Sequence, residues 1–412
     1  MKNEVLYLSY DGMTDPLGQS QVLPYLAGLS KAGYSITLVS FEKKDKFENT
    51  GKAIAQQIKV IGIDWHPLSY TPKPPVLSTL WDVYQLRKKA EELHKQKNFK
   101  IAHCRSYITS LVGEFLKKKY GIKFIFDMRA FFADERVDGG LWNRSNPLYN
   151  RVYLYFKKKE QDFLEHADHT ISLTEAGKEI IHSWKHLKNQ PVPVEVIPCC
   201  ADLEHFSRAN IQQNELSKYR TELGISENDF VVSYLGSVGT WYLPDEMLSF
   251  FKRLLLQKTE AKFLFITGDN PSEILDRVEK LNIAKDRFII RKALRKEVPY
   301  FILLSKFSLF FIQPLFSKKG SSPTKHGEIL GMGIPVICNS GVGDVDRIVR
   351  DTQSGLLVDK FEDIEYDKVI SQLDSLLQTP PEKLRAASEK YYSLEEGVRR
   401  YSEVYQKLVP SP

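Results

Sequence analysis

The sequence of 412 residues has only four cysteines, at positions 104, 199, 200 and 338. Two of them are adjacent, and no group of them has the spacing of a zinc site or of a disulfide framework. Such sparse use of cysteine fits a reducing compartment best. We therefore expect a cytoplasmic protein, with the inner face of the plasma membrane as the place of any membrane contact.

Long apolar runs are missing as well. No uncharged stretch approaches the roughly 18 residues that a membrane-spanning helix needs. The opening residues MKNEVLYLSYDG pass directly into a strand-like segment, without the apolar region or small-residue cleavage site of a secretory signal. The sequence thus predicts neither a membrane span nor a cleaved leader.

Common signatures of a bound metal or cofactor are also lacking. There is no GxxxxGK[ST] loop, and the nine histidines form no HExxH and no His-x-His pair of ligand spacing. Asp344 and Asp346 imitate a metal-binding DxD but follow Gly343 in a loop away from the other candidate residues. We expect no metal and no cofactor. The net charge of +6 is a modest excess, so no nucleic-acid partner is expected.

The sequence does contain a repeated alternation of short apolar runs with longer amphipathic ones. This pattern predicts parallel sheets covered by helices on both faces, the doubly wound α/β class. Because 412 residues exceed what one core usually supports, we predict two domains, 1–205 and 206–385, and a continuous C-terminal helix over 386–412 that packs back on the first domain. The polar stretch ANIQQNELSKYRTELG marks the boundary between the domains.

Candidate site residues lie in loops after strands, where parallel sheets bind ligands. Gly18 precedes a predicted helix at 19–33 and would let a ligand approach its N-terminus. The loop YLGSVGTW supplies Gly236, Ser237, Gly239, Thr240 and Trp241. The third glycine of a dinucleotide fingerprint is missing, so a phosphate or sugar pocket fits this loop better than a nicotinamide cofactor. For Gly18, a purely structural role remains the alternative.

The segment KGSSPTKHGEILGMGIPV places a lysine where a helix dipole does not favour one. Ser322 followed by Pro323 predicts a helix start with a serine N-cap, so Lys325 falls in the first turn. The Thr324 hydroxyl, the Lys325 ammonium and free N–H groups would together suit a diphosphate. Glu328, one turn further, could accept hydrogen bonds from ribose hydroxyls. The alternatives are an exposed lysine and a surface glutamate paired with a lysine.

The segment DMRAFFADERVDGGLW concentrates charge and aromatic rings after a predicted strand. Its charged residues include Asp127, Arg129, Asp134, Glu135 and Arg136. They suit a carbohydrate ring, and a structural network of aspartate and arginine is the alternative. The candidates for an acceptor or sugar pocket are Arg105, Asp134, Glu135, Arg136 and Trp241. His103 is expected to be a packed residue.

Together these segments resemble a retaining GT-B glycosyltransferase of family 4. The resemblance rests on DPLGQSQVLPYLAGLSKAGYSITLV, EHADHTISLTEAGKEII, VIPCCADLEHF, YLGSVGT, SSPTKHGEILGMGIPVI, GVGDVDRIV and SGLLV. DMRAFFADERVDGGLW resembles a subgroup that acts in bacterial surface-polysaccharide assembly. The resemblance implies two Rossmann-like domains facing each other across a cleft, and metal-independent transfer from a nucleotide diphosphate sugar with retention at the anomeric carbon.

The resemblance also implies residue roles. Glu328 matches the second glutamate of the family's E-x7-E motif, which holds the donor ribose, whereas the first glutamate would fall at Gly320. Lys325 becomes the expected cation on the leaving diphosphate, and the role of the family's histidine passes to Asp127 or Arg129. These three residues are the expected catalytic groups.

The sequence also indicates a class of acceptor and leaves two alternative functions open. Basic runs in the first half, such as Lys117–Lys119 and Lys157–Lys159, favour a glycan or lipid-linked acceptor and peripheral membrane contact, although such runs are more often solvated helix faces. A sugar-nucleotide 2-epimerase shares the two-domain architecture. A non-catalytic nucleotide-sugar-binding subunit is the other alternative, because the first glutamate is missing.

Overall fold

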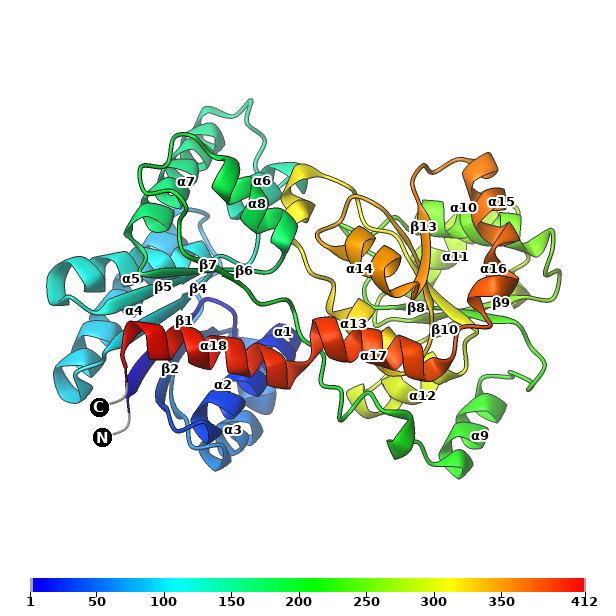
Figure 1. The fold of residues 1–412 in the computed structure, drawn as a ribbon, viewed down its shortest axis with the longest axis horizontal. Helices are drawn as coiled ribbons and strands as arrows, with labels where there is room; N and C mark the ends of the chain where they lie inside the picture. Colours follow the sequence, from blue (N-terminus) through cyan, green and yellow to red (C-terminus); the bar gives the residue numbers. More distant parts are fainter. Residues whose placement is uncertain (1–2, 411–412) are drawn as a thin grey trace. The chain divides into compact units, whose positions relative to one another are not determined.

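The computed structural model describes residues 3–410, which divide into two compact units (Figure 1). Unit 1 contains the chain up to Cys199 and again from Leu394 onward, and unit 2 is Cys200–Ser393. The chain therefore passes between units at 199/200, a few residues before the predicted boundary at 205, and a second time at 393/394. No helix within residues 3–410 is long and apolar enough to cross a membrane.

Unit 1 is built on a seven-stranded parallel sheet with strand order β3-β2-β1-β4-β5-β6-β7. The strands are β1 Glu4–Ser9, β2 Ser35–Glu42, β3 Asp64–Ser69, β4 Ile101–Arg105, β5 Lys123–Asp127, β6 His169–Ser172 and β7 Val194–Val196. The helices are α1 Pro16–Gln21, α2 Leu23–Lys31, α3 Lys44–Val60, α4 Leu77–Lys97, α5 Ser106–Tyr120, α6 Phe132–Asp138, α7 Pro147–His166, α8 Glu175–Ser183 and α18 Leu394–Leu408. The strand order reverses beside β1, as in a doubly wound fold.

Unit 2 repeats this plan with a six-stranded parallel sheet of order β10-β9-β8-β11-β12-β13. The strands are β8 Val231–Leu235, β9 Lys262–Ile266, β10 Phe288–Arg291, β11 Phe307–Phe310, β12 Val336–Asn339 and β13 Gly355–Val358. The α-helices are α9 Gln213–Glu222, α10 Pro244–Leu255, α11 Pro271–Lys280, α12 Val298–Leu303, α13 Thr324–Gly331, α14 Val345–Thr352, α15 Asp363–Ser371, α16 Leu373–Leu376 and α17 Pro381–Tyr392. Short 3-10 turns are η1 Arg208–Asn210, η2 Lys285–Arg287, η3 Arg295–Glu297 and η4 Phe316–Gly320.

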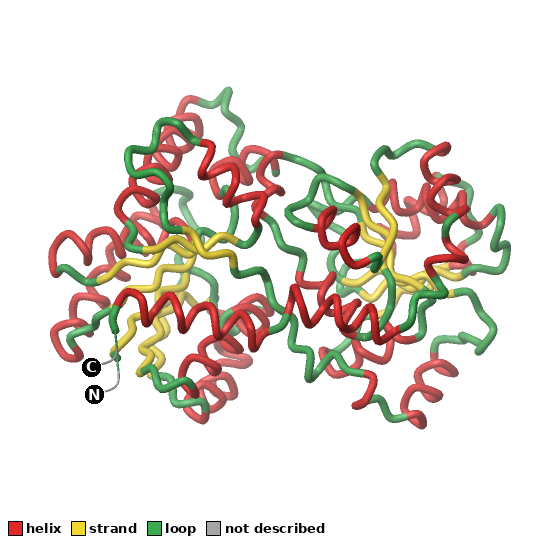
Figure 2. The backbone as a smooth tube through the Cα atoms, in the orientation of Figure 1, coloured by secondary structure: helices red, strands yellow, loops and turns green. Residues whose placement is uncertain are grey.

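The central strands are almost wholly buried because helices cover both faces of each sheet (Figure 2). β4 and β11 are buried at every residue. The edge strands β3 and β10 are only partly buried and were missed by the sequence pattern, since β3 reads DWHPLS and β10 has only four residues. The predicted doubly wound α/β class is confirmed.

Two predicted helices differ in the structure. The helix expected at 19–33 is two helices, α1 and α2, and α1 already begins at Pro16, which occupies the first helical position. The C-terminal helix is also broken, at Ser393, whose extended backbone pairs with Ala201 as an isolated bridge. α17 therefore belongs to unit 2, whereas α18 belongs to unit 1 and packs on α2.

Candidate active site

Gly18 is the third residue of α1 and does not lie in a loop before it, so the predicted position just before the helix is wrong. A Cβ atom at residue 18 would collide with the Gly12 carbonyl oxygen and lie 2.8 Å from Met13 Cα. The backbone of α1 therefore packs directly on the loop that follows β1. This close approach explains the glycine without a ligand.

In unit 2 the reversal of strand order falls between β8 and β11, the place where doubly wound sheets bind ligands. The chain leaves β11, passes through η4 and enters α13 at Thr324. Pro323 takes the N-cap position and no side chain caps this end, so the prediction that Ser322 is the cap is wrong. Ser322 and Thr324 are half-buried beside this end, and Lys325 lies in the first turn, as predicted.

Lys325 is a buried cation enclosed by aromatic rings. Its side chain is 7% exposed, and Nζ lies 4.4 Å from the ring centre of Tyr234 and 3.8 Å from that of Tyr242. Nζ also donates a hydrogen bond to the Tyr234 hydroxyl at 3.3 Å. Within residues 3–410 it forms no ion pair, and burial lowers its pKa to about 7 against the opposing pull of Glu328. A buried ammonium without an anion is costly, and this cost points to an anionic ligand.

Gly236 has a backbone conformation that favours glycine, and it lies against the end of the Lys325 side chain. Its φ is +116°, and a Cβ atom there would lie 2.9 Å from Lys325 Nζ. The loop is held further by the Tyr234 hydroxyl, which donates to the Ser237 carbonyl oxygen, and by Val238 N–H, which donates to Asp269 at 2.5 Å. Gly239 differs, because a Cβ atom at that residue would have no heavy atom within 4 Å, so packing does not demand a glycine there.

Glu328 follows Lys325 by one turn of α13. Burial raises the pKa of Glu328 to about 6, although Arg295 and Lys325 act to lower it. Its Oε1 lies 3.9 Å from Arg295 Nη1, so the partner is an arginine and not the surface lysine that the sequence left open. A carboxylate of this kind can accept hydrogen bonds from two neighbouring hydroxyls.

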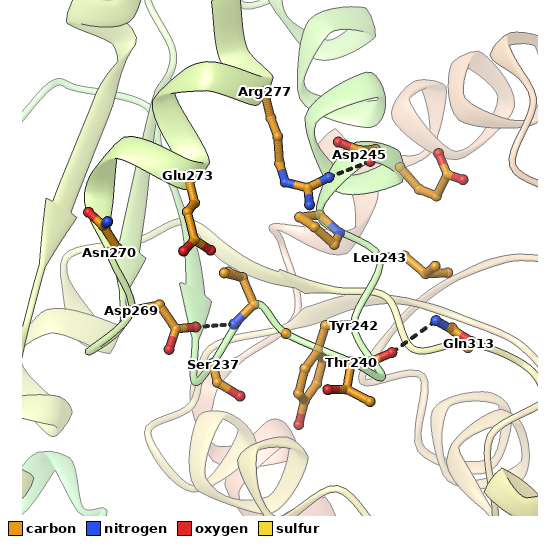
Figure 3. A pocket seen from close by; sticks show the side chains of 14 residues that line it. Ser237, Thr240, Tyr242, Leu243, Asp245, Asp269, Asn270, Glu273, Arg277 and Gln313 are labelled. Carbon is orange, nitrogen blue, oxygen red and sulfur yellow. Dashed lines mark hydrogen bonds and ion pairs between the residues drawn. The ribbon is translucent and has the colours of Figure 1, made fainter. Parts of the chain in front are cut away.

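A cavity of about 480 Å³ opens at the carboxyl ends of β8, β9 and β11 (Figure 3). Its lining comprises Ser237, Val238, Gly239, Thr240, Tyr242, Leu243, Pro244, Asp245, Glu246, Asp269, Asn270, Glu273, Arg277 and Gln313. Three predicted donor residues, Ser237, Gly239 and Thr240, are among them. The loop after β9, TGDN, was missed, although a polar loop after a buried strand is itself a signal.

The cavity wall is rich in carboxylates, of which Asp245 pairs with Arg277 at 2.5 Å (Figure 3). Thr240 has a positive φ of 51°, and its carbonyl oxygen accepts a hydrogen bond from Gln313 at 2.9 Å. Lys325, Glu328 and Trp241 are not in this wall. The predicted donor residues of unit 2 thus divide between the cavity and the buried Lys325 cluster, and Tyr242 touches both.

A second buried lysine of unit 2, Lys318, lies over the ring of Trp241. Lys318 Nζ lies 3.5 Å from the ring centre of Trp241, and the Lys318 side chain is 4% exposed. Gly320, where the first glutamate of the family motif would fall, is buried in the same 3-10 turn η4. The segment from η4 to α13 therefore places two lysines beside the loop that follows β8.

In unit 1, Asp127 ends β5 as a completely buried carboxylate. Its Oδ2 accepts from the Tyr401 hydroxyl at 3.1 Å and lies 3.4 Å from His103 Nε2, while Oδ1 lies 3.7 Å from Arg129 Nη1. Burial by itself raises the pKa of Asp127, but Arg129 and His103 outweigh this and lower it. In this geometry the carboxylate contacts protein groups only, and it joins β5 to α18.

His103 and Arg129 complete this buried group. His103 Nδ1 lies 2.7 Å from the Tyr405 hydroxyl, and burial lowers the pKa of His103, so the imidazole is neutral. Arg129 donates to Cys199 Sγ at 3.2 Å and has a positive φ of 62°, which is strained for a non-glycine residue. His103 is a packed residue, as expected.

The predicted acceptor residues do not form one cluster. Asp134 accepts from the Tyr153 hydroxyl at 2.9 Å and pairs with Lys157 at 2.9 Å, so it joins α6 to α7. Arg136 lies over the Phe132 ring, 5.0 Å from its centre, and the neighbouring Glu135 is on the same short helix. The network interpretation that the sequence left open therefore describes Asp134 well.

Arg105 is the predicted acceptor residue with unused hydrogen-bonding capacity. It ends β4 with 3% exposure, and its Nε donates to Asp11 at 3.0 Å. Its buried Nη1 has no hydrogen-bond partner within residues 3–410. Asp11 was not predicted, although it comes two residues after the end of β1, the strand beside β4. Neighbouring strand ends at a switch point thus hold a charged pair with a free donor.

Two doubly wound units, each with polar groups at its switch point, define the GT-B class of fold. The comparisons agree with this class. Over residues 19–205 the chain matches the family model described as Glycosyltransferase Family 4, and over 217–392 the model described as Glycosyl transferases group 1. The chain belongs to the GT-B glycosyltransferases of the family 4 type and is a transferase.

Individual relatives are distant. The alpha-monoglucosyldiacylglycerol synthase of Streptococcus pneumoniae is 24% identical over 330 residues, which are 78% of this chain and 70% of that protein. Sucrose-phosphate synthase from Thermosynechococcus elongatus has a similar fold, with a TM-score of 0.73, 14% identity and 99% of both chains covered. Anabaena HepE in complex with UDP-glucose gives a TM-score of 0.70 at 14% identity, covering 98% of this chain and 99% of that one.

Proposed function

We propose that this glycosyltransferase moves a sugar from a nucleotide diphosphate sugar to a glycan or lipid-linked acceptor in bacterial surface-polysaccharide synthesis. Transfer proceeds with retention at the anomeric carbon and without a metal. The buried Lys325, which has no anionic partner within residues 3–410, carries the proposal. The complex of HepE with UDP-glucose and the glycolipid product in the name of the Streptococcus relative support the donor and acceptor classes.

The donor binds unit 2 in this proposal. Its diphosphate accepts charge-assisted hydrogen bonds from Lys325 and from the N–H groups at the start of α13, and its ribose hydroxyls donate to Glu328. Negative charge grows on the diphosphate as the bond to the sugar breaks. An ammonium held among aromatic rings and away from water stabilises this charge more strongly than an exposed lysine could.

The acceptor binds unit 1, where Arg105 Nη1 offers a buried donor beside Asp11. The acceptor hydroxyl attacks from the face that the diphosphate leaves, and a departing phosphate oxygen takes its proton, so the configuration at the anomeric carbon is kept. Asp127 and Arg129 act in this proposal by fixing the end of β5, since Asp127 is fully buried.

A panel of nucleotide diphosphate sugars tests the proposal. We expect one donor to raise the melting temperature by mass action and to be hydrolysed slowly without acceptor, with EDTA causing no change. Proton NMR of the anomeric signal follows the reaction. Formation of an epimer without acceptor would instead establish the 2-epimerase, and tight binding without any turnover would establish the non-catalytic subunit.

A further inference from the structure

In the first two turns of α4 large apolar side chains face the solvent and polar ones are buried, which is the reverse of an ordinary surface helix. Four large side chains on its outer side are each more than half exposed: Leu77, Leu80, Trp81 and Tyr84. The residues buried over the same turns are Ser78 and Asp82, which are polar. We call these four exposed residues the α4 apolar face. The second half of the helix is normal, because it buries Leu86, Ala90 and Leu93.

Specific contacts hold the helix in this orientation. The Asp82 carboxylate accepts hydrogen bonds from the Tyr10 hydroxyl at 2.8 Å and from Thr71 N–H at 3.3 Å. Ser78 N–H donates to the Pro74 carbonyl oxygen at 2.9 Å. Rotating the helix to bury its apolar side would break the bonds to Asp82. The outward direction of the α4 apolar face is therefore built into unit 1.

The exposed charged residues next to the α4 apolar face along the chain, from 71 to 90, are of one sign. Asp82 is the only acidic residue between positions 71 and 90, and it is completely buried. Lys73 precedes the face, and Arg87 and Lys88 continue the same helical stripe one turn beyond Tyr84; all three are exposed. An apolar face whose exposed charged neighbours along residues 71–90 are all cations complements an anionic bilayer, which offers acyl chains beneath negative headgroups, although Arg87 also lies 3.6 Å from Glu91.

We propose that the α4 apolar face binds the surface of an anionic lipid bilayer. The helix lies in the plane of the interface, since the face covers eight residues, about 12 Å of helix, against roughly 30 Å of hydrocarbon. Trp81 and Tyr84 stack with ring centres 5.5 Å apart and suit the headgroup level, where aromatic side chains gather. The proposal depends on no property of the donor site.

Vesicle flotation with the full chain, without donor, tests this proposal. We expect binding to vesicles of phosphatidylcholine mixed with phosphatidylglycerol and much weaker binding to phosphatidylcholine alone. The double variant Leu80→Ser, Trp81→Ser should lower the partition coefficient about tenfold or more. The double variant Lys73→Gln, Lys88→Gln should lower it roughly tenfold to thirtyfold on the anionic vesicles. Ile364→Ser, which removes an exposed side chain from α15, is the matched control and should change nothing.

Fluorescence locates the contact. Lipids brominated in their acyl chains should quench part of the tryptophan emission of the wild type, and Trp81→Phe should remove that part while binding persists. Equal binding by the Leu80→Ser, Trp81→Ser variant and by Ile364→Ser would overturn the proposal. A wild type that ignores both kinds of vesicle and forms a dimer, dissociated by the same double variant, would assign the face to a second copy of the chain.

Discussion

The two units bury charge at corresponding places, near the carboxyl ends of their central strands, but they balance it differently. In unit 1 the Asp127 carboxylate faces Arg129 and accepts a hydrogen bond from Tyr401. In unit 2 the Lys325 ammonium faces two phenol rings and one hydroxyl, with its nearest acidic influence one helical turn away in Glu328. In the first arrangement the buried charge has a counter-ion, although Asp127 Oδ1 accepts no hydrogen bond within residues 3–410, whereas the second arrangement lacks an anion.

This difference separates a structural role from a binding role. A buried ion pair is retained because removing either partner leaves the other charge buried and unpaired. A buried cation without an anion weakens the unliganded fold, so it is retained only where a ligand supplies the missing charge. On this argument Asp127 maintains the contact of β5 with α18, whereas Lys325 is the group that meets the donor.

The largest expected effect comes from Lys325→Ala. Losing a preorganised cation from a water-poor site should lower kcat/KM for sugar transfer on the order of a thousandfold, while the melting temperature of the unliganded protein stays equal or rises. Steady-state kinetics with the donor found in the binding screen measures this. Lys252→Ala, which removes an exposed lysine from α10, is the control and should behave as wild type. If Lys325→Ala turns over within a few fold of wild type, Lys325 does not have the binding role that we infer for it in unit 2.

The second effect concerns unit 1. Asp127→Ala leaves Arg129 buried without its counter-ion and removes the acceptor of the Tyr401 hydrogen bond. We expect a loss of about 3 kcal/mol or more, roughly 6–12 °C in the melting temperature of a unit of this size. Hydrogen exchange should quicken first in α18. An unchanged melting temperature together with lost transfer would instead give Asp127 a direct catalytic role.

The sequence predicted the fold well because the inner strands of both sheets are mostly apolar runs separated by amphipathic helices, whereas the edge strands β3 and β10 were missed. It also placed Lys325 in the first turn of α13, since proline signals a helix start regardless of context. It could not separate Asp127 from Lys325, because whether a charged side chain finds a partner depends on residues far along the chain. Tyr401 lies 274 positions from Asp127, and Tyr234 lies 91 positions from Lys325.

Contacts that form only in the folded chain also explain the remaining differences between the predictions and the structure. The role of Gly18 depends on the backbone of Gly12 and Met13, which only the folded loop brings so close to it. Ser393 breaks the C-terminal helix because its backbone pairs with Ala201, and local helix propensity does not register that pairing. The inward-facing Asp82 of α4 likewise required knowledge of Tyr10.

The third effect is a pH dependence of stability specific to Lys325. Its folded pKa of about 7 lies below the ordinary 10.5, so between these values the unfolded chain binds a proton that the folded chain does not. The free energy of unfolding of the wild type, relative to Lys325→Met, should therefore rise with pH from about 7 to about 10.5, by at most about 1.4 kcal/mol per pH unit. Lys325→Met should be the more stable protein near pH 7.

Thermal melts of the wild type and Lys325→Met at pH 7, 8, 9 and 10 measure this difference, and Lys252→Met serves as the control. A nucleotide diphosphate sugar should remove the pH dependence, because a bound anion raises the pKa of Lys325 back toward its ordinary value. Parallel curves for wild type and Lys325→Met at every pH would show that the buried ammonium carries no charge penalty.

The smallest effect tests how α18 is attached to unit 1. Tyr401→Phe removes one hydroxyl that donates to Asp127 at 3.1 Å and leaves the ring in place against Tyr25. We expect a loss of about 1 kcal/mol, since Asp127 keeps Arg129 and His103. Tyr391→Phe is the matched control, because its hydroxyl meets Asp351 at an exposed position and should contribute nothing measurable. If Asp127→Ala and Tyr401→Phe are combined, their effects should fall short of the sum, because both remove the same hydrogen bond. A strictly additive double variant would mean that Tyr401 stabilises α18 by packing alone, and that the carboxylate of Asp127 serves Arg129 and not the helix.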